Sequence, residues 1–152
     1  MYLKEVLKSY GNKKIEIYID MDGVIADYNV GEACNYDKKR PLYTSINKIK
    51  EISTMNNVTL NILSITRKNI GIEEKNIWLD KYVSFIDKAN RFIISKEENP
   101  NKFSSELKVE FLNKIDKNEK IIILIDDDPL ILKEVMKSNN DIVLLKDTVL
   151  VD

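Results

Sequence analysis

Two aspartates, Asp20 and Asp22, follow directly on a short apolar run of the chain, residues 15–19. A run of this length that is rich in isoleucine predicts a buried strand. Because strand side chains alternate between two faces, both carboxylates can project to the same side as the chain leaves the sheet. Two like charges in one small volume are costly unless a cation joins them, so the pair indicates a cation site.

A second acidic cluster, Asp126 and Asp127, follows the most strand-like run of the chain, residues 121–125. If the two strands are neighbours in one sheet, three or four carboxylates converge on one point. Ligation by oxygen alone favours Mg²⁺ over softer metals. The sequence therefore predicts a magnesium site, with Asp20, Asp22, Asp126 and Asp127 as the candidate ligands.

A hydroxyl and a lysine extend this cluster toward phosphate chemistry. Ser64 ends an expected strand at residues 58–65, so its hydroxyl and the following amides can face the same crevice. Lys108 lies near the start of the helix before the second acidic cluster and would bring one positive charge to an anionic ligand. Together these parts describe a phosphate site, in which one carboxylate attacks, a second carboxyl handles the proton, and a metal and a lysine neutralise charge.

The composition excludes several other kinds of chemistry. The chain has no histidine and a single cysteine, Cys34, which excludes Ser-His-Asp and Cys-His nucleophiles, His-ligated zinc, CxxC zinc sites and an internal disulfide. Its 24 basic and 25 acidic residues nearly balance, so no overall field points to nucleic acid or to a membrane. Without a signal peptide or a membrane-spanning run, the chain is expected to be cytoplasmic.

Alternating strands and helices are expected to position these residues. Besides the strands named above, the pattern predicts strands at 91–95 and 142–145 and helices at 2–10, 45–55, 72–82, 104–115 and 130–138. Ser45 is the expected N-cap of the second helix, and Ser104 or Ser105 that of the fourth. This alternation predicts an α/β fold, a single domain over residues 1–152, with ligands at the carboxyl ends of a parallel sheet.

The motifs resemble, in order, the four motifs of the haloacid dehalogenase (HAD) superfamily of phosphohydrolases: DMDGV at residues 20–24, Ser64, Lys108 and IDD at residues 125–127. The first motif with its flanks, IDMDGVIADYN, is closest to the 5′(3′)-deoxyribonucleotidase branch. The resemblance implies a HAD-like Rossmannoid fold, a three-layer α/β/α sandwich with a parallel sheet. The polar, irregular segment 28–44 is too short for the helical cap of that branch, so we expect a minimal cap or flap.

The resemblance also implies roles for the four acidic residues. Asp20 would be the nucleophile that forms an aspartyl-phosphate, and Asp22 would protonate the leaving group and then activate water. Mg²⁺ would be held by Asp20, the backbone carbonyl of Asp22, and Asp126. Asp127 would be a further ligand or a partner of the ligands.

The same resemblance implies that Ser64 and Lys108 bind the phosphoryl oxygens. Lys96 and Lys102, in the preceding segment, are alternatives for the lysine. Lys108 is preferred because the motif lysine commonly opens the helix before the fourth strand.

The expected function is that of a Mg²⁺-dependent phosphomonoesterase whose small phosphorylated substrate is a nucleoside or deoxynucleoside monophosphate. Two alternatives stay open: a small-cap HAD phosphatase that acts on nucleic-acid ends or a phosphoprotein, and a non-catalytic HAD-like module that binds metal or phosphate. Nucleic acid is thus expected only as a substrate, and no membrane partner is expected. Tyr28, Tyr36 and Tyr43 could stack on a nucleobase, although packing against the fold is their expected role.

Overall fold

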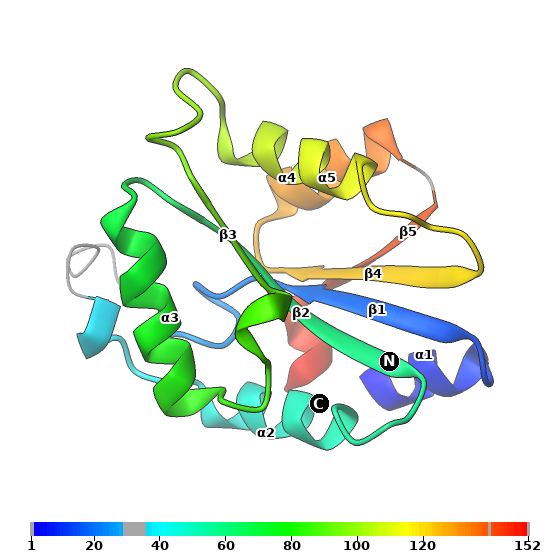
Figure 1. Cartoon of the computed structure of the whole chain (residues 1–152). Helices are drawn as coiled ribbons and strands as arrows, with labels where there is room; N and C mark the ends of the chain where they lie inside the picture. Colours follow the sequence, from blue (N-terminus) through cyan, green and yellow to red (C-terminus); the bar gives the residue numbers. More distant parts are fainter. Residues whose placement is uncertain (1, 29–35, 140, 152) are drawn as a thin grey trace.

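The centre of the fold is a five-stranded parallel sheet with the strand order β3-β2-β1-β4-β5 (Figure 1). The computed structural model describes residues 2–28, 36–139 and 141–151. Each expected strand is present and matches the prediction to within one residue at either end. The strands are β1 (Lys14–Ile19), β2 (Val58–Thr66), β3 (Arg91–Ser95), β4 (Lys120–Asp126) and β5 (Ile142–Lys146).

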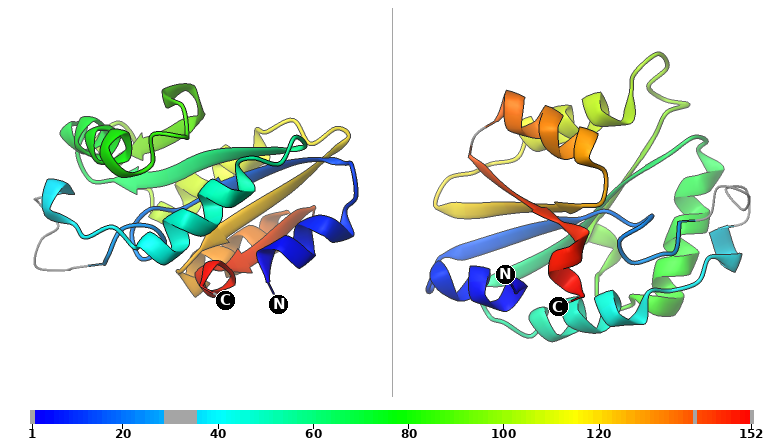
Figure 2. Two further views of the ribbon diagram at one scale, coloured as in Figure 1. Left: turned by 90° about the horizontal axis from the view of Figure 1, so that it is seen from below. Right: turned by 180° about the vertical axis from the view of Figure 1, so that it is seen from behind.

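Helices cover both faces of this sheet. On one face lie α4 and α5, and the other face is covered by α1, α2, α3 and η4 (Figures 1 and 2). The described helices are α1 (Leu3–Ser9), α2 (Tyr43–Ile52), α3 (Ile70–Tyr82), α4 (Ser104–Asn113) and α5 (Pro129–Ser138), with the 3-10 turns η2 (Tyr36–Lys38), η3 (Lys88–Asn90) and η4 (Asp147–Leu150). The chain therefore has the α/β architecture that the alternation of strands and helices predicts. None of the helices in the described ranges has the length and apolar character needed to cross a membrane.

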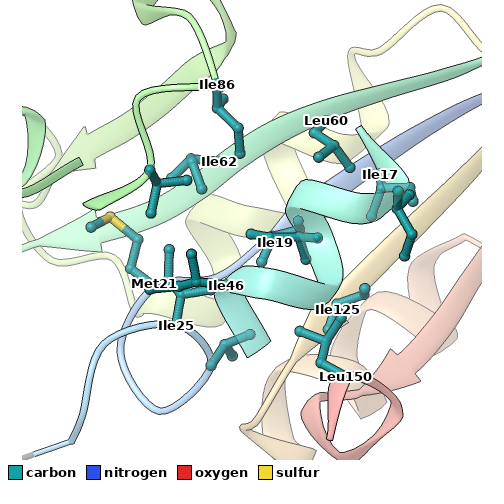
Figure 3. Close-up of a cluster of buried hydrophobic side chains, with 14 of the residues drawn as sticks. Ile17, Ile19, Met21, Ile25, Ile46, Leu60, Ile62, Ile86, Ile125 and Leu150 are labelled. Carbon is teal, nitrogen blue, oxygen red and sulfur yellow. The ribbon is translucent and has the colours of Figure 1, made fainter. Parts of the chain in front are cut away.

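The central strand β1 is buried on both faces, as its sequence predicts. Ile17 and Ile19 are fully buried in the larger hydrophobic cluster, together with Ile62 and Ile125 from the two neighbouring strands (Figure 3). Tyr18 points to the opposite face and packs in the cluster under α4 and α5. Burying each such side chain stabilises the fold by about 1.5–3 kcal/mol. The end of β1 is therefore a firmly fixed platform for the residues that follow it.

Helix α3 begins at Ile70, two residues before its predicted start, and the predicted N-caps of α2 and α4 are wrong. Ser45 does not cap α2, because the helix begins two residues earlier and Ser45 is buried inside its first turn. The earlier start follows from a hydrogen bond from the amide of Leu42 to the carbonyl of Ile25 (2.8 Å), which fixes the entry of the chain into the helix. Helix α4 begins after Phe103, whose side chain makes no cap, so neither Ser104 nor Ser105 is the N-cap.

The segment after β1 forms a tight turn at the carboxyl end of this central strand. The amide of Ala26 donates to the carbonyl of Met21 (3.0 Å), and the amide of Gly23 donates to the carbonyl of Ala26 (2.8 Å). A bridge between Ala26 and Pro41 then ties the turn to the chain that enters α2. Residues 29–35 of the expected cap segment, including Cys34, lie outside the described residues.

Candidate functional site

Three carboxylates lie together at the carboxyl ends of the adjacent strands β1 and β4. Asp20, Asp126 and Asp127 each offer an oxygen, and these oxygens lie within 4.8 Å of one another. The strand ends are fixed side by side because the amide of Asp20 donates to the carbonyl of Ile125 (3.0 Å). The structure thus brings together the two acidic clusters that are far apart in the sequence.

Lys108, on the buried side of α4, lies between two of these carboxylates. Its ammonium nitrogen is 3.0 Å from Asp20 Oδ1 and 2.6 Å from Asp126 Oδ2. Burial acts to lower the pKa of Lys108, but the two carboxylates outweigh it and leave the pKa above its usual value. Lys102, one of the alternatives, instead pairs with Glu110 at the surface (2.9 Å). Lys96 follows β3, where its backbone amide donates to the carbonyl of Thr66 (2.9 Å).

Burial and neighbouring negative charge raise the pKa of two of these carboxyl groups, Asp20 and Asp127. Burial raises the pKa of Asp20 above its usual value, although Lys108 opposes the change. Burial, with the neighbouring charges of Asp20 and Asp126, raises the pKa of Asp127 to about 7. A divalent cation bound by these oxygens would remove most of this cost. The all-oxygen donor set fits Mg²⁺, which is the metal that the sequence predicts.

Asp128, the last residue of the acidic run, has a different part in the structure. Its side chain accepts a hydrogen bond from the amide of Leu130 (2.9 Å) and thereby caps α5. The amide of Asp128 in turn donates to Asp126 Oδ1 (3.0 Å), which holds that carboxylate in place. The start of α5 therefore orients the second acidic cluster.

The side chain of Asp22 lies apart from this acidic cluster and is paired with two lysines. Lys39 Nζ is 2.6 Å from Asp22 Oδ1, and Lys75 Nζ is 3.2 Å from Asp22 Oδ2. Burial acts to raise the pKa of Asp22, but the nearby ammonium groups outweigh it and leave the pKa below its usual value. The carboxylate of Asp22 thus faces positive charge, whereas that of Asp20 faces both acids and a lysine.

Ser64 is buried near the carboxyl end of β2 and faces the same group of residues. Its hydroxyl oxygen accepts a hydrogen bond from Lys75 Nζ (2.7 Å), which also donates to the carbonyl of Ile65 (2.9 Å). Helix α3 approaches the strand closely because Gly71 has no side chain: a Cβ there would lie 1.9 Å from Thr66 Oγ1. One turn later, this close approach brings Lys75 to Ser64.

Lys39 and Lys75 were not among the predicted site residues. A signal for Lys75 exists in the sequence, because it occupies the apolar face of α3 with Trp78 and Leu79, three and four residues further on. A lysine at a core-facing helix position needs a buried partner. Lys39 has no such signal, since it lies in an irregular segment without periodicity.

A cleft of about 420 Å³ opens over the site. Tyr28 lines it and is 65% exposed. Tyr36 is buried, with its ring 6.0 Å from that of Trp78, and Tyr43 lies on the surface against Tyr82 (6.4 Å). The cleft is lined by Asp20, Asp22, Tyr28, Ile65, Ser104, Lys108, Asp126, Asp127, Asp128, Pro129 and Ile131.

Comparison with known proteins relates this fold to HAD domains. No protein-family profile matches the sequence, and no curated protein matches it. The solved structure of the HAD domain of the effector protein Lem4 from Legionella pneumophila superposes with a TM-score of 0.54 at 15% identity, over 90% of this chain and 86% of that chain. The chain thus has the α/β fold of HAD domains, with the sheet order 3-2-1-4-5.

Two further matches are chains of an RNA repair assembly. In the structure of the Pnkp1/Rnl/Hen1 RNA repair complex, the match has a TM-score of 0.67 at 16% identity. A second structure of the Pnkp1/Rnl/Hen1 complex gives a TM-score of 0.69 at 14% identity. Each match covers 90% of this chain but only 43% and 46% of the respective matched chain, so this chain spans less than half of their length.

Proposed function

We propose that the chain is a Mg²⁺-dependent phosphomonoesterase that works through an aspartyl-phosphate on Asp20. The observation that carries this proposal is the placement of Asp20 beside Asp126 and Asp127 at the ends of the two central strands, with Lys108 buried between them. A HAD-like fold is consistent with this chemistry, and the four sequence motifs support it.

The charges of the site favour a dianionic ligand. Four carboxylates face three buried ammonium groups, so the side chains alone carry a small negative charge. A bound divalent cation would reverse the sign and leave a net positive site. Such a site favours the two negative charges of a phosphate monoester over the single charge of a diester.

In the proposed reaction, a carboxylate oxygen of Asp20 attacks the phosphorus atom and the bond to the leaving oxygen breaks. The carboxylate of Asp22, whose pKa is lowered in the free protein, takes up a proton from solvent before the reaction and gives it to the leaving oxygen. The carboxylate that results then removes a proton from the water that releases phosphate. Ser64 and Lys108 bind the phosphoryl oxygens. Mg²⁺, when bound, supplies positive charge that stabilises the charge on these oxygens.

The oxygen ligands of Mg²⁺ would come from Asp20, Asp126 and the backbone carbonyl of Asp22. Asp127 would be a further ligand or would orient the others. This assignment rests on the clustered oxygens and on the resemblance of the motifs to those of HAD phosphatases.

For the substrate, we propose a nucleoside or deoxynucleoside monophosphate, which the form of the first motif supports. Tyr28 lines the cleft beside Asp20 and Asp22 and offers an exposed ring on which a base could stack. The second candidate is a phosphorylated nucleic-acid end, favoured by the structural match to chains of an RNA repair complex. Both candidates carry a phosphate monoester, so the chemistry is the same.

A substrate screen with and without Mg²⁺ tests this proposal. The substrates are nucleoside 5′- and 3′-monophosphates, sugar phosphates, a phosphopeptide and oligonucleotides with a 3′-phosphate. Release of phosphate from mononucleotides that stops on adding EDTA is the expected result. Turnover of oligonucleotides but not mononucleotides would show that the substrate is a nucleic-acid end and would leave the proposed reaction unchanged.

Matched variants test the nucleophile in the same screen. Asp20→Asn is expected to lose activity. Asp116→Asn should keep its activity, because Asp116 lies before the amino end of β4, at the end of the strand away from the site. Metal-dependent turnover that survives Asp20→Asn undiminished would contradict the mechanism.

A further inference from the structure

Lys39 reaches the site from the segment between β1 and α2. Lys39 is only 7% exposed, and its ammonium nitrogen is 2.6 Å from Asp22 Oδ1. Lys75 holds the other oxygen of the same carboxylate from α3, on a different side. Asp22 is therefore fixed between two cations that come from separate elements of the fold.

The backbone of Lys39 is itself held in place. Its carbonyl accepts a hydrogen bond from Trp78 Nε1 (3.0 Å), an indole buried in α3. At the following residue, the carbonyl of Arg40 accepts from the amide of Asp27 (2.8 Å), which ties the segment to the turn after β1. These contacts join the segment both to α3 and to the turn that carries Asp22.

The side chain of Lys39 is also oriented, by the ring of Tyr36. The ammonium group lies 4.8 Å from the centre of this ring, within the range of a cation–π contact. Tyr36 in turn packs edge-on against Trp78 at 6.0 Å. An ammonium group fixed in this way is already arranged for its contact with Asp22 and loses little further freedom in making it.

The hydroxyl of Tyr36 also lies close to the carboxylate of Asp22. The hydroxyl of Tyr36 is buried and makes no well-formed hydrogen bond among the described residues. Burial and the nearby charge of Asp22 raise the pKa of this hydroxyl, so it keeps its proton. Donors from Lys39, Lys75 and Tyr36 thus gather beside the one carboxylate that the proposed mechanism requires to move a proton.

We propose that Lys39 is a positioning residue that orients the carboxylate of Asp22 toward the leaving oxygen. The inference rests on the function proposed above. When Asp22 gives up its proton to the leaving oxygen, a carboxylate is formed, and the fixed ammonium of Lys39 stabilises this carboxylate where it forms. Lys39 would thereby join the segment between β1 and α2 to the proton-transfer step.

The test uses two substrates that differ in their need for a proton. A nucleoside monophosphate has an alkoxide leaving group that must be protonated, whereas 4-nitrophenolate leaves from 4-nitrophenyl phosphate without help. Lys39→Met is expected to lower kcat/KM for the nucleotide by about a hundredfold, the lower range of general-acid catalysis, and for the aryl phosphate by only a small factor. The ratio of the two values does not depend on the fraction of folded enzyme, so partial misfolding leaves it unchanged.

Two comparisons complete the design. Lys38→Met, at an exposed lysine on the same turn, should leave the ratio at its wild-type value. The Asp22→Asn variant should change the ratio in the same direction as Lys39→Met and at least as far. Adding Lys39→Met to Asp22→Asn should change the ratio no further, because Lys39 acts through the carboxylate that is already gone.

The outcomes separate the two proposals. If the wild-type protein hydrolyses neither substrate, the proposed function fails. If the wild type is active and Lys39→Met lowers both rates equally or neither, Lys39 does not act through Asp22 and the inference is overturned.

Discussion

Gly23, the glycine of the DMDGV motif, makes room for Asp127, and filling that room should disturb the metal site. Its φ is +81°, and a Cβ built there would lie 2.0 Å from Asp127 Oδ2 and 2.7 Å from Asp127 Cγ. Ordinary contacts begin near 3.4 Å, so in Gly23→Ala the carboxylate of Asp127 must move by more than an ångström. The variant thus displaces a candidate metal ligand without removing it.

Gly11 provides a matched control for the backbone strain alone. Its φ is +61°, and nothing lies within 4 Å of the place that an added Cβ would take, so Gly11→Ala adds strain without a clash. A side chain in the left-handed region costs about 1–2 kcal/mol at either position. Both variants should therefore lose a similar amount of stability in the absence of metal, apart from the clash at Gly23.

The free energies of unfolding of the two variants should respond differently to Mg²⁺. At a Mg²⁺ concentration of about a hundred times Kd, binding stabilises a folded protein by about 2.7 kcal/mol. Disturbing the surroundings of a metal site weakens metal affinity by about tenfold at least. If Gly23→Ala weakens the affinity for Mg²⁺ by this factor, the gain in stability falls to about 1.4 kcal/mol at the same Mg²⁺ concentration. Urea unfolding with and without Mg²⁺ should show the full gain for Gly11→Ala and the reduced gain for Gly23→Ala. Equal gains in both variants would refute the reasoning that Asp127 serves the metal.

Three further predictions concern charge at the same site. Lys108→Met removes the ammonium group between Asp20 and Asp126, so kcat/KM for phosphate release should fall by about a hundredfold or more. The affinity for Mg²⁺, measured by calorimetry, should not fall, because a cation that competes with the metal is gone. Mg²⁺ affinity should also weaken by about 20-fold between about pH 7.5 and about pH 5.5, because Asp127, with a pKa of about 7, must be deprotonated to bind. The same raised pKa predicts that the metal-free protein loses stability as the pH rises from about 4 to 7, where the folded protein holds a proton that the unfolded chain has released. Unfolding in EDTA across this range checks the sign, and a rise in stability would contradict it.

The sheet could be predicted from the sequence because its strands are short, mainly apolar runs with clear ends. The run before Asp20 and the run before Asp126 are both buried, and parallel strands place their carboxyl ends at one edge. Helix starts were harder to predict, since a serine such as Ser45 or Ser104 is a good cap only if the chain enters the helix there. At α2, a long-range hydrogen bond to Ile25 sets the entry instead.

The acidic cluster and Lys108 followed from residue types at the strand ends and from the motifs, whereas the lysines around Asp22 did not. Helical spacing places Lys75 on the apolar face of α3, but its contact with Asp22 also needs the close approach of α3 to β2 that Gly71 allows, and no local pattern encodes that approach. Lys39 depends on the indole of Trp78, nearly forty residues away in the sequence. Local patterns thus predicted the residues on the sheet, and tertiary packing decided which side chains joined them.

Chemical trapping shows whether Asp20 becomes covalently phosphorylated during turnover. The protein is mixed with its best substrate and Mg²⁺, quenched in acid within milliseconds to seconds, reduced with borohydride and digested for mass spectrometry. Reduction converts an aspartyl-phosphate to homoserine, so homoserine is expected at position 20 and nowhere else, and none is expected in Asp20→Asn. Homoserine or phosphate at any other residue during turnover would show that Asp20 is not the nucleophile.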